Sequence, residues 1–122
     1  MKVIHTEKAP EAIGPYSQAI VSGGLVFTSG QIAINPKSGT VEAKTIEEQT
    51  EQVCKNIAAL LKEGGTSIEN VVKTNCYLKN MEDFAAFNAV YSKYFTSKPA
   101  RSCVAVKELP KDVLVEIDTI AE

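Results

Sequence analysis

The residues most capable of chemistry in this sequence lie near its C-terminus. Arg101 is the only arginine among the 13 basic residues, and Glu116 lies in an alternating Val-Glu-Ile-Asp run. A guanidinium can hold a carboxylate through parallel N–H bonds, which also fixes the orientation of the ligand. A glutamate close by can deprotonate a water molecule or shuttle a proton. The pair therefore indicates a site that binds a small carboxylate and activates water beside it.

The surrounding pattern predicts a C-terminal β-hairpin over residues 103–107 and 113–121, joined by a turn at Leu109–Asp112. One register packs the apolar residues of both strands against the helices. It places these polar side chains together on the opposite face: Arg101, Cys103, Glu116 and Asp118. A small carboxylate would then fit between Arg101 and Glu116. The same spacing also fits a structural ion pair at an interface, so both interpretations stay open.

Cys103 is a poor candidate for a nucleophile because no histidine is placed to activate its thiol. His5 is the only histidine and lies far from Cys103 in the sequence. The backbone of Cys103 is a better candidate for ligand contact, whereas Cys54 and Cys76 fit small core positions. The cysteines form no CxxC pair and no Cys/His cluster. This predicts reduced thiols, a cytoplasmic location and no metal site.

Two turns supply further candidate binding residues. Tyr16 lies in a Gly-Pro-Tyr-Ser turn, where its phenol could lean over a cleft or simply pack. Ser29 and Gly30 end a predicted strand, and the glycine lets a ligand approach the backbone closely. Taken one at a time, each of these residues is also explained by turn geometry alone.

Two helices position these candidates. A Thr-x-x-Glu capping box followed by apolar residues at helical spacing predicts a helix over residues 45–63. A second helix is predicted over residues 80–95, with Asn80 as its N-cap. Asn88 lies one turn after Phe84, inside the apolar stripe of this helix. A polar side chain there must find hydrogen-bond partners.

Short apolar or alternating segments predict strands over residues 3–6, 18–21, 25–29, 71–78, 103–107 and 113–121. The order βββ-α-β-α-ββ predicts an α+β fold, a six-stranded mixed sheet with two helices on one face. The other face carries Leu25, Phe27 and Leu114, so oligomerisation through it is a hypothesis. No repeat or linker divides the sequence, so we expect one domain over residues 1–122.

The composition argues against several classes of protein. Apolar residues make up 44% and charged residues 23%, which is typical of globular proteins and not of disordered or collagen-like chains. The net charge of −2 leaves no basic excess for a phosphate backbone, so nucleic acid is not an expected partner. No apolar run approaches the length of a membrane span, and no leader-like segment begins the sequence. We therefore expect no membrane association.

Five segments together resemble the Rid family of enamine/imine deaminases, most closely its 2-iminobutanoate/2-iminopropanoate deaminase branch. The segments are GPYSQA (14–19), TSGQI (28–32), DFAAFNAVYSKYF (83–95), PARSCVAV (99–106) and VEIDTIA (115–121). The PAR triplet followed by a Val-Glu-Ile strand at this separation is specific to the family. The resemblance extends over nearly the whole chain.

The resemblance implies a chorismate-mutase-like fold, assembled as a homotrimer with clefts between neighbouring subunits. It also implies hydrolysis of short 2-imino acids, products of pyridoxal-phosphate-dependent dehydratases, to 2-oxo acids and ammonia without a cofactor. Arg101 would bind the substrate carboxylate, Glu116 would position and activate water, and the Cys103 backbone would contact the imine end. The other residues lining the cleft would be Tyr16, Ser29, Gly30 and Asn88.

Lys98, just before the PAR triplet, departs from the family pattern, in which many members carry an aromatic residue. This departure bears on the shape of the cleft rim and hence on substrate range. Two other functions are alternatives: a non-catalytic trimeric module that binds small carboxylates or partner proteins, and an RNA-acting translation inhibitor. The presence of both Arg101 and Glu116 favours the enzyme, and the acidic net charge argues against RNA.

Overall fold

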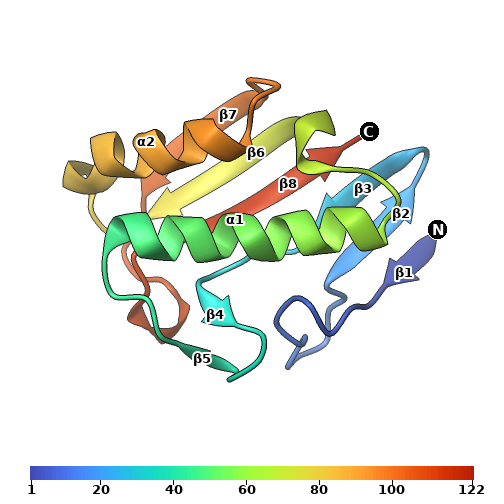
Figure 1. The fold of residues 1–122 in the computed structure, drawn as a ribbon, viewed down its shortest axis with the longest axis horizontal. Helices are drawn as coiled ribbons and strands as arrows, with labels where there is room; N and C mark the ends of the chain where they lie inside the picture. Colours follow the sequence, from blue (N-terminus) through green and yellow to red (C-terminus); the bar gives the residue numbers. More distant parts are fainter.

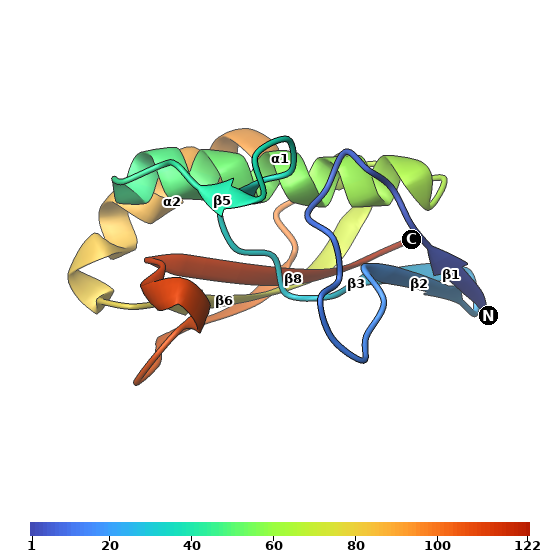
Figure 2. The ribbon, with the colours of Figure 1, turned by 90° about the horizontal axis from the view of Figure 1, so that it is seen from below.

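The computed structural model describes residues 1–122, which form a sheet layer and a helix layer that covers one face of the sheet (Figures 1 and 2). The α-helices are α1 (Ile46–Glu63) and α2 (Phe84–Tyr94). The six strands of the sheet are β1 (Lys2–Ile4), β2 (Ala19–Ser22), β3 (Leu25–Thr28), β6 (Val71–Leu78), β7 (Ala100–Ala105) and β8 (Val115–Ala121). The predicted α+β architecture is confirmed. None of the helices combines the length and the apolar composition that a membrane span requires.

Helix α1 begins where the sequence predicts. Thr45 Oγ1 accepts a hydrogen bond from the Glu48 backbone N–H at 3.1 Å, and the Glu48 carboxylate accepts one from the Thr45 N–H at 3.4 Å. This capping box satisfies donors that have no partner inside the helix. Val53, Ile57 and Leu60 are fully buried, so the apolar face of α1 lies in the core above the sheet.

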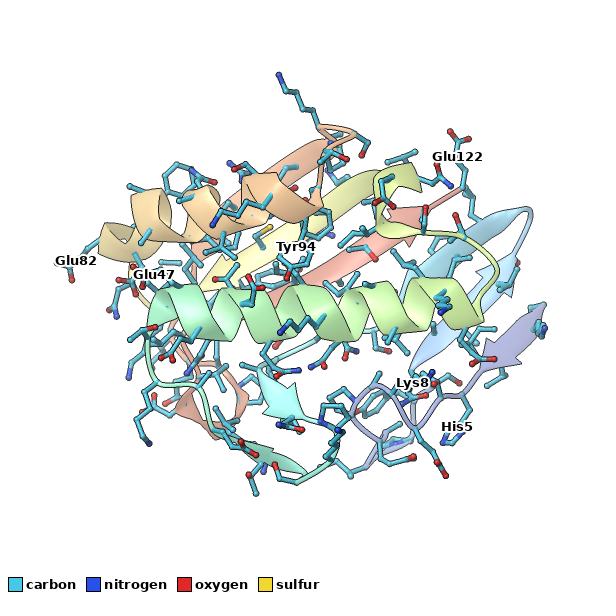
Figure 3. All side chains as sticks on the ribbon, viewed as in Figure 1. His5, Lys8, Glu47, Glu82, Tyr94 and Glu122 are labelled. Carbon is cyan, nitrogen blue, oxygen red and sulfur yellow. The ribbon has the colours of Figure 1, made fainter.

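Helix α2 begins later than predicted. The N–H of Asp83 bonds to the carbonyl of Asn80, which makes a separate 3₁₀ turn at Met81–Asp83, and the Asn80 side chain caps nothing. The α-helix itself starts at Phe84. Near its end, Tyr94 lies between the two helices, where its hydroxyl donates a hydrogen bond to Glu51 of α1 (Figure 3). The two helices are thus joined above the sheet.

The strand order in the sheet is β1-β2-β3-β8-β6-β7. Strands β6 and β7 run parallel and are connected through α2, while β8 lies antiparallel between β3 and β6. The predicted C-terminal hairpin is therefore wrong, because β7 and β8 are separated by β6. The predicted turn does exist, as a 3₁₀ turn at Pro110–Asp112. It connects two strands that are not neighbours, which a local turn signal cannot reveal.

The register between β6 and β7 decides which face carries Arg101. Arg101 and Cys103 pair with Thr74 and Cys76, which are buried under the helices. Paired residues of neighbouring strands share a face, so Arg101 and Cys103 also point toward α2. Val104, which was expected in the core, is 48% exposed on the other face. The predicted grouping of these two polar residues with the acidic residues of β8 is therefore wrong.

The side chains of strand β8 point to the predicted faces, although its partner strands are β3 and β6 and not β7. Val115 and Ile117 are fully buried under the helices, and Glu116 and Asp118 alternate with them and face the other way. The open face also carries apolar side chains, as hypothesised. Phe27, for example, is 38% exposed there. Leu114 is an exception, because it packs against the core instead.

A small two-stranded ribbon, β4 (Ile34–Asn35) and β5 (Thr40–Val41), was not predicted. Its strands are too short to show an alternating pattern. Helix α1 holds the chain before and within β4, because the Asn56 Nδ2 donates to the carbonyls of Ile32 at 3.2 Å and Ile34 at 2.9 Å. Asn56 is only 1% exposed, so these bonds are made inside the protein.

Candidate active site

Arg101 is held by helix α2. Its Nη1 donates a 2.7 Å hydrogen bond to Asn88 Oδ1. The guanidinium carbon lies 4.8 Å from the ring centroid of Tyr91, 5.4 Å from that of Phe84 and 5.9 Å from that of Phe87. Aromatic faces attract a guanidinium. Helix α2 therefore supplies both a cation–π cradle and a hydrogen-bond acceptor, and Asn88 finds the partner that its place in the apolar stripe requires.

The neighbouring strand fixes this cradle. The Tyr91 hydroxyl and Thr74 Oγ1 lie 2.8 Å apart, and Thr74 is the β6 residue that pairs with Arg101. No carboxylate forms an ion pair with Arg101, and its bond to Asn88 is its only side-chain hydrogen bond. Because a guanidinium has five N–H donors, most of the donors of Arg101 remain available for an anion.

Arg101 opens into a pocket of about 490 Å³, here called the arginine pocket. Asn88 and Arg101 are the predicted site residues in its lining. The residues that sequence reasoning missed are Tyr91, Ser92, Phe95, Thr96 and Pro99. Lys98 also lines the pocket, with a positive φ of 52°. The residue that departs from the family pattern therefore lies at this site.

Cys103 does not line the arginine pocket. Its partly buried side chain packs against the core. Burial raises the pKa of the Cys103 thiol, although Arg101 nearby acts in the opposite direction. A raised pKa keeps the thiol protonated and unreactive, so the geometry offers no support for a nucleophilic thiolate.

Glu116 lies on the opposite face of the sheet from Arg101. Burial raises the pKa of the Glu116 carboxyl, and the negative charge of Asp118 adds to this rise. Asp118 accepts hydrogen bonds from Asn75 Nδ2 at 2.9 Å and from the Tyr77 hydroxyl at 3.4 Å. Tyr77 is also the β6 residue that pairs with Glu116. A carboxylate with a raised pKa is a stronger base, as proton abstraction from water requires.

Gly30 gives Glu116 the room that it occupies. A Cβ atom at position 30 would overlap the Glu116 carboxylate. Gly30 does not have a positive φ, so this position needs a glycine for space and not for backbone conformation. The sequence predicted that a ligand would approach Gly30. The structure brings the Glu116 side chain there.

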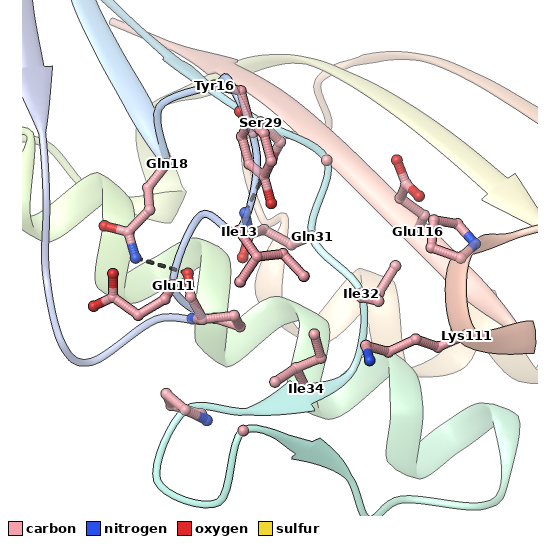
Figure 4. A pocket seen from close by; sticks show the side chains of 15 residues that line it. Glu11, Ile13, Tyr16, Gln18, Ser29, Gln31, Ile32, Ile34, Lys111 and Glu116 are labelled. Carbon is pink, nitrogen blue, oxygen red and sulfur yellow. Dashed lines mark hydrogen bonds between the residues drawn. The ribbon is translucent and has the colours of Figure 1, made fainter.

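A pocket of about 570 Å³ opens beside Glu116 (Figure 4), here called the glutamate pocket. The predicted residues Tyr16, Ser29, Gly30 and Glu116 all line it. Tyr16 is 51% exposed. The Ser29 hydroxyl donates a hydrogen bond to the carbonyl of Ser17 at 2.5 Å and so stabilises the turn that contains Tyr16 and Ser17.

Several residues of the glutamate pocket were missed by sequence reasoning: Ile13, Gln31, Ile32, Ile34, Pro110 and Lys111. The isoleucines in these segments are typical of core positions, and Lys111 lies in a segment that is typical of a turn. Gln31 is 5% exposed, and its Oε1 accepts no hydrogen bond. The one available signal was proximity in sequence, because Gln31 and Ile32 directly follow Gly30 in the TSGQI segment.

The structure thus brings the candidate residues together in two sets. Asn88 and Arg101 line the arginine pocket, which can bind an anion. The other set, with Glu116, lines the glutamate pocket, which can hold water next to a base. No group of three or more His, Cys, Asp or Glu side chains is arranged to hold a metal ion.

Comparison with known proteins places the chain in a family. Residues 6–122 match the family described as Endoribonuclease L-PSP. The chain is 55% identical to the Lactococcus lactis protein named "Putative regulator AldR", over 100% of this chain and 98% of that protein. It is 46% identical to the 2-iminobutanoate/2-iminopropanoate deaminase of Salmonella typhimurium, over 98% of this chain and 96% of that one.

A solved structure shares the fold. The crystal structure of E. coli TdcF with bound serine matches with a TM-score of 0.94 at 40% identity, covering 99% of this chain and 98% of that chain. The match over residues 6–122 and the near-complete coverage of these relatives agree with the resemblance that the sequence motifs indicated. The chain therefore belongs to the Endoribonuclease L-PSP family, also called the RutC or Rid family.

Proposed function

We propose that the protein is a hydrolytic deaminase that converts reactive short-chain 2-imino acids, 2-iminobutanoate and 2-iminopropanoate, to 2-oxo acids and ammonia. The observation that carries the proposal is the guanidinium of Arg101, which is cradled by α2 and has unused donors at the edge of a pocket. The Glu116 carboxylate, with its raised pKa, supplies the matching base. Cleavage of an imine by water needs no redox step, so these two groups can carry it without an organic cofactor.

The active site is completed between copies of the chain in a homotrimer. Within one chain the sheet separates Arg101 from Glu116, so one copy contributes its arginine pocket and a neighbour contributes its glutamate pocket. The open face of the sheet, with Phe27 and Val104 exposed, supplies apolar surface for such association. A head-to-tail contact of this kind closes into a ring when its rotation permits.

The substrate carboxylate binds across the free N–H groups of Arg101, which orients C2 toward the neighbouring Glu116. Glu116 accepts a proton from water while the water oxygen forms a bond to C2. The nitrogen takes up this proton from Glu116 and becomes the amine of a tetrahedral intermediate. The C2 hydroxyl then loses the second water proton, which also passes to the nitrogen through Glu116, and ammonia leaves as the C2–N bond breaks and the 2-oxo acid forms. Proximity and proton transfer supply most of the rate enhancement.

The relatives support the substrate class. The Salmonella relative is named for the two imines proposed here, and TdcF binds serine, a small amino acid with a carboxylate. The same substrates belong to amino-acid metabolism, and we propose that the protein acts on them in the cytoplasm. The family description mentions an endoribonuclease. The net charge of −2 supports a small-molecule substrate over RNA for this chain.

A second candidate is a non-catalytic trimer that binds small carboxylates or a partner protein. The identity of 55% to a protein named as a regulator favours it. Such a module would need the carboxylate grip of Arg101 but not the base. The two candidates therefore differ in their dependence on Glu116.

The test measures imine hydrolysis by competition with semicarbazide during threonine dehydratase or amino-acid oxidase turnover. An active deaminase removes the imine and slows semicarbazone formation. We expect competition from the wild type, and none from Arg101→Ala or Glu116→Gln. Lys93→Gln on α2 and Glu82→Gln in the preceding turn are matched charge controls, because neither residue lines the two pockets. If the folded wild-type oligomer does not slow semicarbazone formation from any imine, the deaminase proposal is overturned and the non-catalytic binding trimer is favoured.

A further inference from the structure

Thr74 connects Arg101 to helix α2 from inside the protein. Helix α2 follows strand β6 along the chain and leads into strand β7 (Figure 1). Thr74 on β6 pairs with Arg101 on β7, and its Oγ1 lies 2.8 Å from the hydroxyl of Tyr91 on α2. The Tyr91 ring centroid lies 4.8 Å from the guanidinium carbon of Arg101. The three residues are therefore mutual neighbours, and Thr74 is the one that lines neither pocket.

The hydroxyl pair of Thr74 and Tyr91 is shielded from water. Thr74 is fully buried and Tyr91 is 7% exposed. The Tyr91 hydroxyl makes no other hydrogen bond, so it depends on Thr74 as its partner. A buried hydroxyl that loses its partner costs free energy, which opposes any movement of the ring away from Thr74. These contacts lie inside one chain, so they form without a neighbouring copy.

The Thr74 hydroxyl is itself held by strand β6. The buried Cys76 thiol donates to Thr74 Oγ1 at 3.8 Å. Burial raises the pKa of this thiol to about 12, which keeps the S–H donor in place. Burial also raises the pKa of the Tyr91 phenol, although the Thr74 hydrogen bond acts in the opposite direction. All the groups of this buried contact are therefore neutral at physiological pH.

Aromatic packing alone does not fix the Tyr91 ring. Its centroid lies 5.4 Å from that of Phe87, with the ring planes tilted by 45°, and 4.4 Å from that of Phe95, with the planes at 29°. Aromatic pairs tolerate a range of offsets and tilts with similar energies. The hydrogen bond to Thr74 is directional, so it decides where the ring lies beneath the guanidinium.

We propose that Thr74 is a positioning residue for carboxylate binding, which acts through the Tyr91 ring on the Arg101 guanidinium. The proposal rests on the proposed deaminase function and adds a residue remote from both pockets to it. A two-point grip on a carboxylate needs the guanidinium in a defined plane. Asn88 holds one nitrogen of Arg101, and the Tyr91 ring supports the flat face of the group. Loss of the Thr74 contact should therefore weaken substrate binding more than the chemical step, whose base is Glu116.

The experiment removes each hydroxyl separately and then both together. Thr74→Val keeps the shape of the side chain, and Tyr91→Phe keeps the ring. Each should raise KM in the semicarbazide assay by about 3- to 10-fold, the effect of one hydrogen bond. The kcat value should change less than about twofold, as expected when a binding interaction is lost. The double variant should raise KM no further than the larger single effect, because both changes remove the same bond. Thr74→Ser should keep KM close to that of the wild type.

Thr119→Val is the matched control for a purely structural role. Thr119 pairs with Thr74 on the neighbouring strand β8, is 1% exposed, and has its Oγ1 3.0 Å from that of Thr28. It makes no hydrogen bond to Tyr91 or Arg101. The control should lower the thermal unfolding midpoint as Thr74→Val does but leave KM unchanged. An unchanged KM in folded Thr74→Val, an equal rise in Thr119→Val, or additive effects in the double variant would overturn the positioning role.

A binding measurement separates this proposal from the proposed function. Calorimetry with 2-oxobutanoate, the expected product, reports carboxylate binding without catalysis. If the wild type binds it but hydrolyses no imine, the deaminase proposal fails, and weaker binding in Thr74→Val by about 3- to 10-fold still supports the positioning role. Equal binding in the wild type and Thr74→Val would overturn that role. If the folded wild type neither hydrolyses an imine nor binds 2-oxobutanoate, both proposals are overturned.

Discussion

Arg101 and Glu116 lie on opposite faces of the same six-stranded sheet. Arg101 pairs with the buried Thr74 and points toward α2, whereas Glu116 pairs with Tyr77 and points away from the helices. A small imino acid cannot touch both side chains of one chain. The proposed chemistry therefore requires a second copy, which makes catalysis a property of the assembly.

This separation predicts complementation between two inactive variants. Arg101→Ala and Glu116→Gln should each lose at least about a hundredfold in kcat/KM, because each removes charge-assisted hydrogen bonds from the site. Unfolding and refolding the two variants together in equal amounts should restore about a quarter of the wild-type activity, since random assembly joins an intact arginine half to an intact glutamate half at that frequency. The semicarbazide assay measures the recovery.

The control mixture combines two variants of the same half, Glu116→Gln and Gly30→Ala. No assembly of these two chains contains an intact glutamate half, so this mixture should stay inactive. Recovery in the control, or no recovery when the Arg101→Ala and Glu116→Gln chains are shown to co-assemble, would contradict a site shared between copies.

Asn88 should act on substrate binding by positioning Arg101. Its Oδ1 accepts the 2.7 Å bond from Arg101 Nη1, and a hydrogen bond to a charged group contributes about 1.5–3 kcal/mol. Asn88→Ala should therefore raise KM about 10-fold or more, with a smaller effect on kcat. Asn88→Asp should be worse, because the new carboxylate would pair with the guanidinium and compete with the substrate. Steady-state kinetics of both variants tests this order, and equal KM values in wild type and Asn88→Asp would refute it.

The activity should fall as the pH drops through the raised pKa of Glu116, because only the ionised carboxylate can accept a proton from water. Burial raises that pKa first, and Asp118 raises it further. Asp118→Asn removes the neighbouring charge, so the acidic limb of the kcat/KM profile should move to lower pH. Asp83→Asn, at a carboxylate outside both pockets, should leave the limb where it is. An unmoved limb in Asp118→Asn would show that Asp118 does not tune the base.

Gly30→Ala tests whether the position of the Glu116 carboxylate matters for catalysis. The added Cβ would overlap that carboxylate and displace it. A displacement of about 1 Å can cost about a hundredfold in rate, so we expect a loss of that order in kcat. The backbone conformation at Gly30 suits other residues, so the thermal unfolding midpoint should stay close to that of the wild type. A variant with normal kcat would show that Glu116 need not occupy this place.

The parts of the fold that depend on local signals could be predicted from the sequence. The capping box at Thr45 and Glu48 correctly predicted the start of α1. The alternation of apolar and acidic residues in β8 correctly predicted the face that carries Glu116. Strand partners could not be predicted in this way. The pairing of β7 with β6 is parallel and runs through α2, and the insertion of β8 between β3 and β6 leaves no mark within either segment.

The error over Arg101 has a similar physical cause. The alternation of polar and apolar residues in this strand predicts that Arg101 faces away from the helices. It also predicts that Val104 is buried against them. In the structure the aromatic rings of α2 and the Asn88 amide stabilise the guanidinium on the helix side. Phe84 and Tyr91 read as ordinary core residues, so only the folded arrangement reveals that they form a cation–π cradle.

The raised pKa of Glu116 should also appear as a cost in stability. When the folded-state pKa of a carboxyl lies above its unfolded value, folding takes up a proton, so stability falls as the pH rises between the two values. Glu116→Gln has no such proton, and it should therefore unfold at a higher temperature than the wild type at neutral pH although it is inactive. The difference should shrink as the pH falls below the ordinary pKa of glutamate, where both side chains are neutral. Calorimetric melts at several pH values measure it, with Glu82→Gln as the exposed control. A variant that is less stable than the wild type at neutral pH would mean that the Glu116 carboxylate stabilises the assembly, contrary to the cost that burial imposes on it.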